Sequence, residues 1–123
     1  MSKHKAIPKT KRIQVYKKYN GHCAYCGCEM EYKDMQVDHI KSVYQHNDYV
    51  CDMTKEEVYD ISNLMPTCRM CNFYKGSGDI EFLRERLSKT LIENVRKPFD
   101  YRLALKYGLI QENIHPIKFY FEQ

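Results

Sequence analysis

The sequence predicts a single α+β domain built around a bound metal ion. Three features predict it: a strand-like segment at residues 35–40, apolar residues at helical spacing between residues 80 and 95, and two Cys-x-x-Cys pairs. A length of 123 residues fits one domain, and 43% hydrophobic residues can form its core. Because no stretch approaches the roughly 18 apolar residues of a membrane span and no apolar run follows the basic start, we expect a soluble cytoplasmic protein.

Two elements are expected in the N-terminal part. Thr10 can cap a helix over residues 10–19, which the Asn-Gly pair at 20–21 ends because both residues tolerate a left-handed backbone. Residues 29–40 look like a β-hairpin whose second arm is the strand-like segment.

The middle of the chain shows a weaker pattern. Over residues 41–62 we expect an irregular connection with one short helix, which a capping box of Thr54 and Glu57 opens. A further short helix is expected to begin near the second cysteine pair and to stop at residues 76–78.

A longer helix is predicted after this point. Asp79 can cap it and Pro98 closes it. Its apolar residues lie three or four positions apart and form one stripe that we expect to face the core: Ile80, Leu83, Leu87, Leu91 and Val95. Residues 100–107 resemble a short helix ended by Gly108, and residues 117–121 alternate like a final strand.

The cysteines predict a structural zinc site. Two pairs, Cys23/Cys26 and Cys68/Cys71, have the spacing of zinc knuckles, and in a reducing cytosol such pairs are more often metal ligands than disulfides. Four thiolates leave no open position for water, so the ion would hold two distant segments together without taking part in catalysis. The alternative is four buried cysteines that act as small apolar residues. Cys28 and Cys51 are expected to be free or packed thiols.

Three polar positions could carry chemistry: the dipeptide Asp38-His39, Asn63, and Asn72 directly after the last cysteine. Hydrolysis of a phosphodiester needs a water, a base that deprotonates it and a cation on the phosphate. A histidine suits the base because its pKa is near neutrality, and carboxylate or amide oxygens suit Mg²⁺ or Mn²⁺. Taken singly, each position also fits a turn, a cap or a satisfied hydrogen bond.

Together, these motifs resemble the HNH endonuclease family, in the zinc-knuckle branch that is common in phage and restriction proteins. The resemblance covers residues 21–78 and rests on five short motifs in order: Cys23-Ala-Tyr-Cys26-Gly27, Val37-Asp38-His39-Ile40, Asn63-Leu64-Met-Pro66-Thr-Cys68, Cys68-Arg-Met-Cys71-Asn72 and Lys75-Gly76. It implies a ββα-metal core at 21–78, between a basic arm and helix (1–20) and a helical extension with a terminal strand (79–123). It also implies a bacterial or phage-infected host cell.

The resemblance implies a role for each polar residue. His39 would be the general base, and Asn63 would hold the loop that positions it. Asp38 and Asn72 would bind the catalytic Mg²⁺ or Mn²⁺, which makes this an HNN variant. The product would be DNA cut to leave 5′-phosphate and 3′-hydroxyl ends. The four paired cysteines match the structural zinc ligands of the family.

DNA contacts are expected from basic residues. Residues 1–20 hold seven Lys and Arg and no acid, whereas the remainder holds 13 basic and 16 acidic residues. A basic segment on a near-neutral body points to a polyanion such as nucleic acid, or to a solvated tail. The candidate phosphate contacts are Lys11, Arg12, Lys17 and Lys18 in this segment, and Arg69 and Lys75 beside Asn72.

The roles implied for Asp38 and His39 also constrain the backbone of the strand that carries them. Neighbouring residues of a regular strand point to opposite faces, yet both side chains must reach one phosphate. We therefore expect backbone pairing to be broken at one of them. The distance from His39 to Asn63 is longer than is usual in the family, and the proline and glycine common after this histidine are missing.

Two other functions fit the same residues. One is a zinc module that binds nucleic acid or protein without catalysis. The other is a zinc adaptor in a phage packaging or anti-restriction complex, with residues 98–123 as its docking surface. A homodimer is a further expected partner, because one fold offers one active site.

Overall fold

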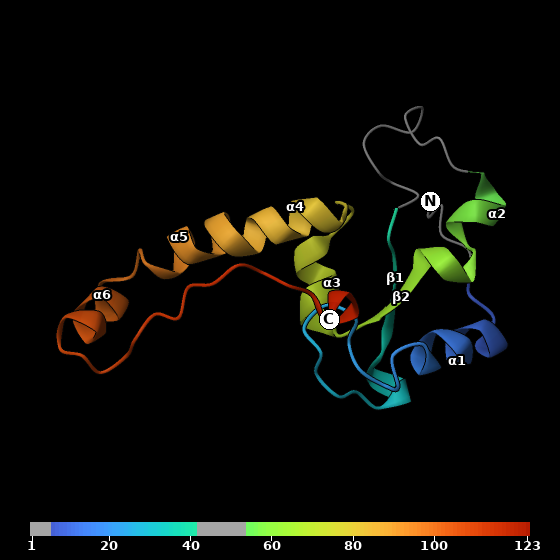
Figure 1. The fold of residues 1–123 in the computed structure, drawn as a ribbon, viewed down its shortest axis with the longest axis horizontal. Coiled ribbons are helices and arrows are strands. Elements are labelled where there is room, and N and C mark those ends of the chain that lie inside the picture. Colours follow the sequence, from blue (N-terminus) through green and yellow to red (C-terminus); the bar gives the residue numbers. More distant parts are fainter. Residues whose placement is uncertain (1–5, 42–53) are drawn as a thin grey trace.

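A computed structural model describes residues 6–41 and 54–123. Its elements are short and follow one another along the chain as Figure 1 shows: α1 (Lys9–Lys17), the 3-10 turn η1 (Tyr32–Asp34), β1 (Gln36–His39), α2 (Lys55–Val58), the 3-10 turn η3 (Ile61–Asn63), β2 (Leu64–Thr67), α3 (Arg69–Lys75), α4 (Ile80–Glu85), the π-helical turn η4 (Arg86–Thr90), α5 (Leu91–Val95), α6 (Phe99–Lys106) and the 3-10 turn η5 (Tyr120–Glu122). The mixture of helices with a small sheet confirms the predicted α+β class.

The sheet has two antiparallel strands, β1 and β2, with Gln36 opposite Thr67 and His39 opposite Leu64. The predicted strand is confirmed, but its expected partner within residues 29–40 is wrong. Residues 32–34 form η1 instead, and the described pairing before it is one isolated bridge from Glu29 to His22. All four residues of β2 are buried, so β1 is paired with a strand that lies inside the core.

The strand β2 contributes to two hydrophobic clusters, because its successive side chains point to opposite faces. Leu64 packs with Val15 of α1 and Met35 on one face. Met65 packs on the other face with the first cysteine segment, with Leu83 and with Phe119. The side chains of β1 also alternate between these two faces, so Asp38 and His39 lie on opposite faces of the sheet.

The helix α1 lies beside the first cluster and ends at Lys17, two residues before the predicted end, while the predicted left-handed residues follow it. Asn20 and Gly21 have positive φ angles of 55° and 79°, so both adopt the left-handed conformation that stops a helix. The predicted cap is wrong, since the helix begins at Lys9 and Pro8 occupies the N-cap position without a side-chain bond. Proline suits that position because it has no N–H to leave unpaired.

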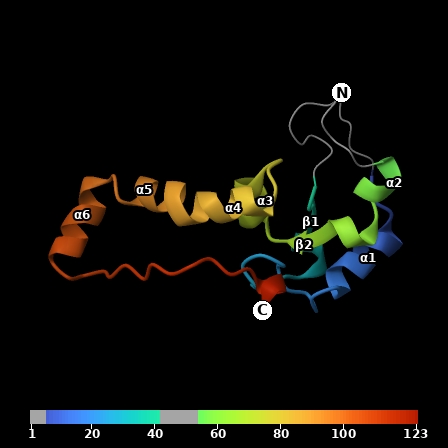
Figure 2. The same ribbon diagram turned by 45° about the horizontal axis from the view of Figure 1, so that its top comes forward.

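The long helix runs through α4, η4 and α5 and projects from the rest of the molecule (Figures 1 and 2). The Asp79 side chain accepts a hydrogen bond of 2.8 Å from the Phe82 N–H, which confirms the predicted cap. Leu83 is buried in the core and Leu87 packs against it, whereas Val95 is 39% exposed. The apolar stripe therefore faces the core only along its first half.

After α6 the chain returns beside the long helix and brings η5 back to the cysteine segment (Figure 2). The predicted strand over 117–121 is wrong. The backbone N–H groups of Tyr120 and Phe121 donate to the carbonyls of Tyr25 and Ala24, so this segment closes onto a turn. Its alternating apolar residues bury Phe119 against Tyr25. Within the two described stretches, none of the helices has both the length and the apolar character of a membrane-spanning segment.

Candidate active site and metal centre

The four paired cysteines form one cluster. The sulfur atoms of Cys23, Cys26, Cys68 and Cys71 all lie within 4.8 Å of one another, and those of Cys26 and Cys68 are 3.8 Å apart. A tetrahedral zinc ion with Zn–S bonds of about 2.3 Å requires sulfur separations of about 3.8 Å. The cluster therefore has the ligands and the spacing of a closed structural metal site. Cys28 is exposed and is not one of the four, and Cys51 lies outside the described residues.

Local backbone geometry holds these sulfurs in place. Gly27 has a φ of +81°, and a Cβ there would lie 2.7 Å from the Tyr120 ring, so the turn after the first pair requires glycine. A hydrogen bond from the Cys71 thiol lowers the pKa of Cys23 to about 4, and backbone amides contribute. Burial raises the pKa of Cys26 to about 12. A bound metal ion would remove this difference between the cysteine pKa values, because it would hold all four groups as thiolates.

His39 lies at the end of β1 on the face that carries Met35. Its Nδ1 is 3.0 Å from the carbonyl oxygen of Val58, and its ring packs edge-on against Tyr59 with centroids 4.9 Å apart. A carbonyl can only accept, so Nδ1 carries the proton and the lone pair of the neutral ring is on Nε2. The ring is 6% exposed, and its orientation is fixed by both contacts.

Asn63 binds the same carbonyl as His39. Its Nδ2 donates to Val58 O at 2.8 Å and to Lys41 O at 3.1 Å, and its Oδ1 accepts from the Lys41 N–H at 3.0 Å. The position of Val58 is set in turn by α2, whose predicted capping box is confirmed by reciprocal bonds of 2.8 and 3.2 Å between Thr54 and Glu57. Asn63 thus fixes both the residue that orients His39 and the backbone that follows β1.

Asp38 lies on the opposite face of β1, where α3 packs. Its Oδ2 accepts a hydrogen bond of 2.7 Å from the Tyr25 hydroxyl and forms an ion pair of 2.9 Å with the Lys75 ammonium group. Lys75 also donates to the main-chain oxygen of His39 at 3.1 Å. Burial raises the pKa of Asp38, while the charge of Lys75 and both hydrogen bonds oppose this shift.

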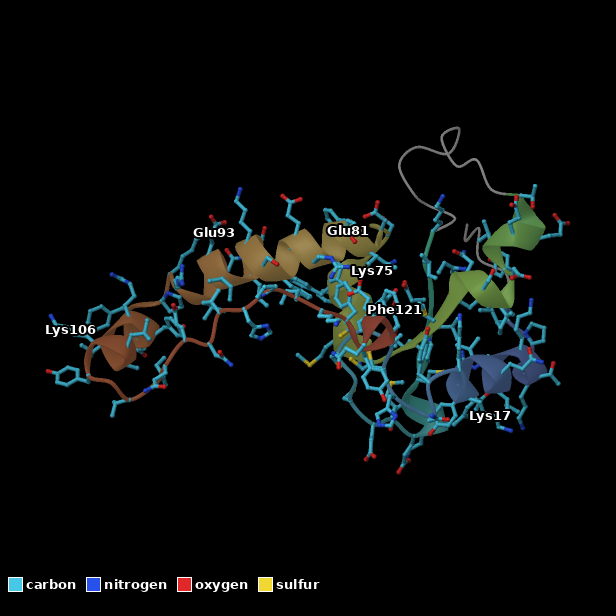
Figure 3. The ribbon with its side chains drawn as sticks, in the orientation of Figure 1. Lys17, Lys75, Glu81, Glu93, Lys106 and Phe121 are labelled. Atoms are coloured by element: carbon cyan, nitrogen blue, oxygen red, sulfur yellow. The ribbon has the colours of Figure 1, made fainter. Side chains whose placement is uncertain are left out.

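The expectation that Lys75 contacts the DNA backbone is wrong, since its side chain is 0% exposed. The reason is the carboxylate of Asp38, because a buried lysine needs a charged or hydrogen-bonded partner. Figure 3 shows Lys75 in the middle of the molecule, while Lys17 projects from α1.

Asn72 lies on the same side of β1 as Asp38. Its Nδ2 donates to the Gln36 Oε1 at 2.6 Å. Gln36 and Asp38 are two residues apart on β1 and share one face, and Asn72 and Lys75 are three apart on α3 and share one face. This interface between β1 and α3 therefore holds a carboxylate and two amide groups, whose oxygens suit a hard divalent cation. Tyr25 and Gln36 were missed from the sequence; the alternation along β1 could have indicated Gln36.

The expectation of a broken strand at Asp38 or His39 is also wrong. Both residues pair with β2, opposite Met65 and Leu64, and the Ile40 N–H continues the bonding to Asn63 O at 2.8 Å. The two side chains therefore leave the strand toward different neighbours, Asp38 toward α3 and His39 toward the segment after α2.

Most of the other candidate DNA contacts donate to the protein itself. Lys11 bonds to Tyr59 O at 2.7 Å, Arg12 to Met35 O at 3.1 Å, and Lys18 to Ile61 O and Leu64 O at 3.0 and 2.9 Å. Burial lowers the pKa of Lys18. These bonds attach α1 and the residue after it to β2 and to the residues that precede the two strands, whereas Lys17 and Arg69 are exposed.

Comparisons with known proteins give one family match and one structural neighbour. Residues 23–78 match the family model HNH endonuclease. Among solved structures, the chain is similar to the type II-C Cas9 enzyme from Actinomyces naeslundii, with a TM-score of 0.51 and 20% sequence identity. That match covers 85% of this chain and 11% of the Cas9 chain, so at this identity it shows the fold alone. No curated protein sequence matches the chain.

Proposed function

Since residues 23–78 form an HNH endonuclease domain, we propose that this protein is a metal-dependent endonuclease that hydrolyses DNA phosphodiester bonds. The observation that carries the proposal is the shared carbonyl of Val58, to which both His39 and Asn63 bond. A histidine held in one tautomer and one orientation by a carbonyl group, which an asparagine holds in place, is the arrangement that a general base requires.

In this proposal His39 takes the proton of the attacking water at Nε2. The Nδ1–H bond to Val58 keeps the second ring nitrogen protonated, and it stabilises the imidazolium that forms when the water is deprotonated. Asn63 acts through Val58 and Lys41 and does not touch the substrate. It is a positioning residue.

Asp38 and Asn72 would hold the catalytic Mg²⁺ or Mn²⁺. The donor set fits such an ion, since it combines a buried carboxylate with amide oxygens on one face of β1. When bound, the ion would supply a Lewis acid for the phosphate and the leaving oxygen. The four-cysteine cluster would hold a structural zinc ion, which fixes the start of α3 and hence the position of Asn72.

The continuous strand is compatible with a general base on one of its faces and cation ligands on the other. In an in-line displacement the attacking and the leaving oxygen lie on opposite sides of phosphorus. A base on one face of a strand end and cation ligands on the other can serve those two sides. A broken strand was expected because Asp38 and His39 were required to lie on one face. An in-line displacement does not impose that requirement.

Phosphate contacts outside the site are proposed for the exposed Lys17 and Arg69. Such contacts position a duplex without reading its sequence, so we expect low base specificity. The described part of the chain contains one such site, so a double-strand break would require two chains or two encounters.

The test is plasmid cleavage by the zinc-loaded protein with and without Mg²⁺ or Mn²⁺. We expect nicking that depends on the divalent ion and that His39→Ala reduces by about 10²-fold or more. His115→Ala is the matched control, because His115 is an exposed histidine on the returning segment. Equal cleavage by wild type and His39→Ala would contradict the mechanism.

A second function has one observation in its favour. The carboxylate of Asp38 is already paired with Lys75, as it would be in a domain that keeps the fold and has lost the cation. The protein would then be a zinc-containing module that binds nucleic acid or protein. It would show salt-dependent DNA binding and no cleavage with any divalent ion.

A further inference from the structure

The buried Lys75 is not explained by the roles given so far. Its ammonium group binds two acceptors that belong to neighbouring residues, Asp38 Oδ2 at 2.9 Å and the main-chain oxygen of His39 at 3.1 Å. The Tyr25 hydroxyl binds the same Oδ2 at 2.7 Å. Both donors use one oxygen of the carboxylate, so neither of them occupies Oδ1.

The charges of Asp38 and Lys75 at this interface cancel each other. Asp38 contributes one negative charge and Lys75 one positive charge, and both side chains are at least 94% buried, while Tyr25, Gln36 and Asn72 are neutral. Divalent cations in phosphoryl-transfer sites are usually held by one or two carboxylates together with the phosphates of the substrate. A cation that approaches Asp38 here also approaches an ammonium group 2.9 Å from that carboxylate, and water screens this repulsion poorly.

We propose that Lys75 positions Asp38 through Oδ2 and neutralises it, so that the divalent cation and DNA bind the site cooperatively. This rests on the proposed nuclease function. DNA phosphate supplies the negative charge that the protein has cancelled, and the free protein therefore binds the cation weakly. Because coupling between two ligands is reciprocal, the cation raises the affinity for DNA by the same factor.

Tyr25 is the matched residue that separates positioning from charge. Tyr25→Phe removes one hydrogen bond to Oδ2 and changes no charge. Lys75→Met removes a hydrogen-bond donor to the same oxygen and the positive charge as well. Both variants hold the Asp38 carboxylate less firmly. A change in the coupling between cation and DNA binding that appears only in Lys75→Met therefore results from the loss of the Lys75 charge.

The experiment measures Mn²⁺ binding, by the electron paramagnetic resonance signal of free Mn²⁺, to the zinc-loaded His39→Ala protein with and without a short DNA duplex. The DNA alone, and the DNA with Asp38→Asn protein, give the background. We expect the duplex to tighten Mn²⁺ binding by about tenfold or more. In Lys75→Met we expect tighter Mn²⁺ binding without DNA and less than about threefold tightening with it, while Tyr25→Phe keeps the wild-type ratio.

The outcomes separate this inference from the proposed function. Tight Mn²⁺ binding that is equal with and without DNA, in a protein that cleaves plasmid, overturns the inference alone. No Mn²⁺ binding above background in either state, together with no cleavage, overturns the proposed function and the inference with it. The comparison of His39→Ala with and without DNA decides the coupling even where Lys75→Met does not fold.

Discussion

His39 and Asn63, which are far apart in sequence, donate to one main-chain oxygen, that of Val58, at 3.0 and 2.8 Å. The general base that we propose is therefore oriented by a peptide group that another side chain holds in place. This links the stability of the segment around α2 to the activity of the site, and the two can be measured separately.

Asn63→Ala removes three hydrogen bonds and leaves the Lys41 N–H and the Val58 carbonyl with fewer partners. We expect the free energy of unfolding to fall by about 2 kcal/mol. We also expect cleavage to fall more than about tenfold in protein that is still folded, because His39 loses its fixed orientation. Urea unfolding and plasmid nicking measure the two effects, and Asn94→Ala on the exposed end of α5 is the control. Unchanged nicking by Asn63→Ala would contradict the positioning role.

Removal of the structural metal is expected to disrupt the fold. Cys26→Ser takes one ligand from the cluster, whereas Cys28→Ser changes an exposed cysteine that is not one of the four. We expect Cys26→Ser to lose its zinc and its cooperative thermal transition, and Cys28→Ser to keep both. The zinc content of purified protein and circular dichroism measure this. Loss of zinc in both variants would place Cys28 among the ligands.

Phe119 tests whether the returning segment belongs to the core. It is 2% exposed and packs edge-on against Tyr25 with ring centroids 5.4 Å apart. Phe119→Ala is expected to cost about 3–5 kcal/mol of unfolding free energy. Phe73→Ala changes a ring that is 83% exposed, and we expect it to cost less than about 0.5 kcal/mol. Similar costs for the two variants would mean that the segment does not pack as described.

Arg84 attaches the same segment to the long helix. Its guanidinium donates to Glu122 at 2.6 and 3.0 Å and to Ile117 O at 2.7 Å, and it lies over the Phe119 ring. We expect Arg84→Gln to speed tryptic cleavage after Lys118 several-fold, because local opening of this segment becomes easier. Cleavage after Lys106 on α6, labelled in Figure 3, is the internal control and is expected to stay unchanged.

The sequence predicted several features that depend on local residues. The cysteine spacing, the capping box at Thr54, the cap at Asp79 and the strand within residues 35–40 all follow from short segments, and the structure has them. The family resemblance is confirmed over residues 23–78. The roles of the individual site residues stay predictions that the experiments above test.

Apart from the N-cap of α1, which is Pro8 and not Thr10, the features discussed here that the sequence did not predict depend on distant partners. The alternating residues 35–40 indicate a strand but do not specify β2 as its neighbour. The alternating residues 117–121 fill an aromatic contact with Tyr25 and pair with no strand in the described part of the chain. Lys75 looks like a surface cation because its partner, Asp38, lies on another element.

The return of residues 117–122 to the first cysteine turn has a consequence for biosynthesis. On a ribosome both cysteine pairs are made long before Phe119, so the nascent chain can capture its metal while Tyr25 still lacks the aromatic ring that covers it. Metal binding can therefore come first, and the contact between Phe119 and Tyr25 forms only after residues 117–122 have been translated.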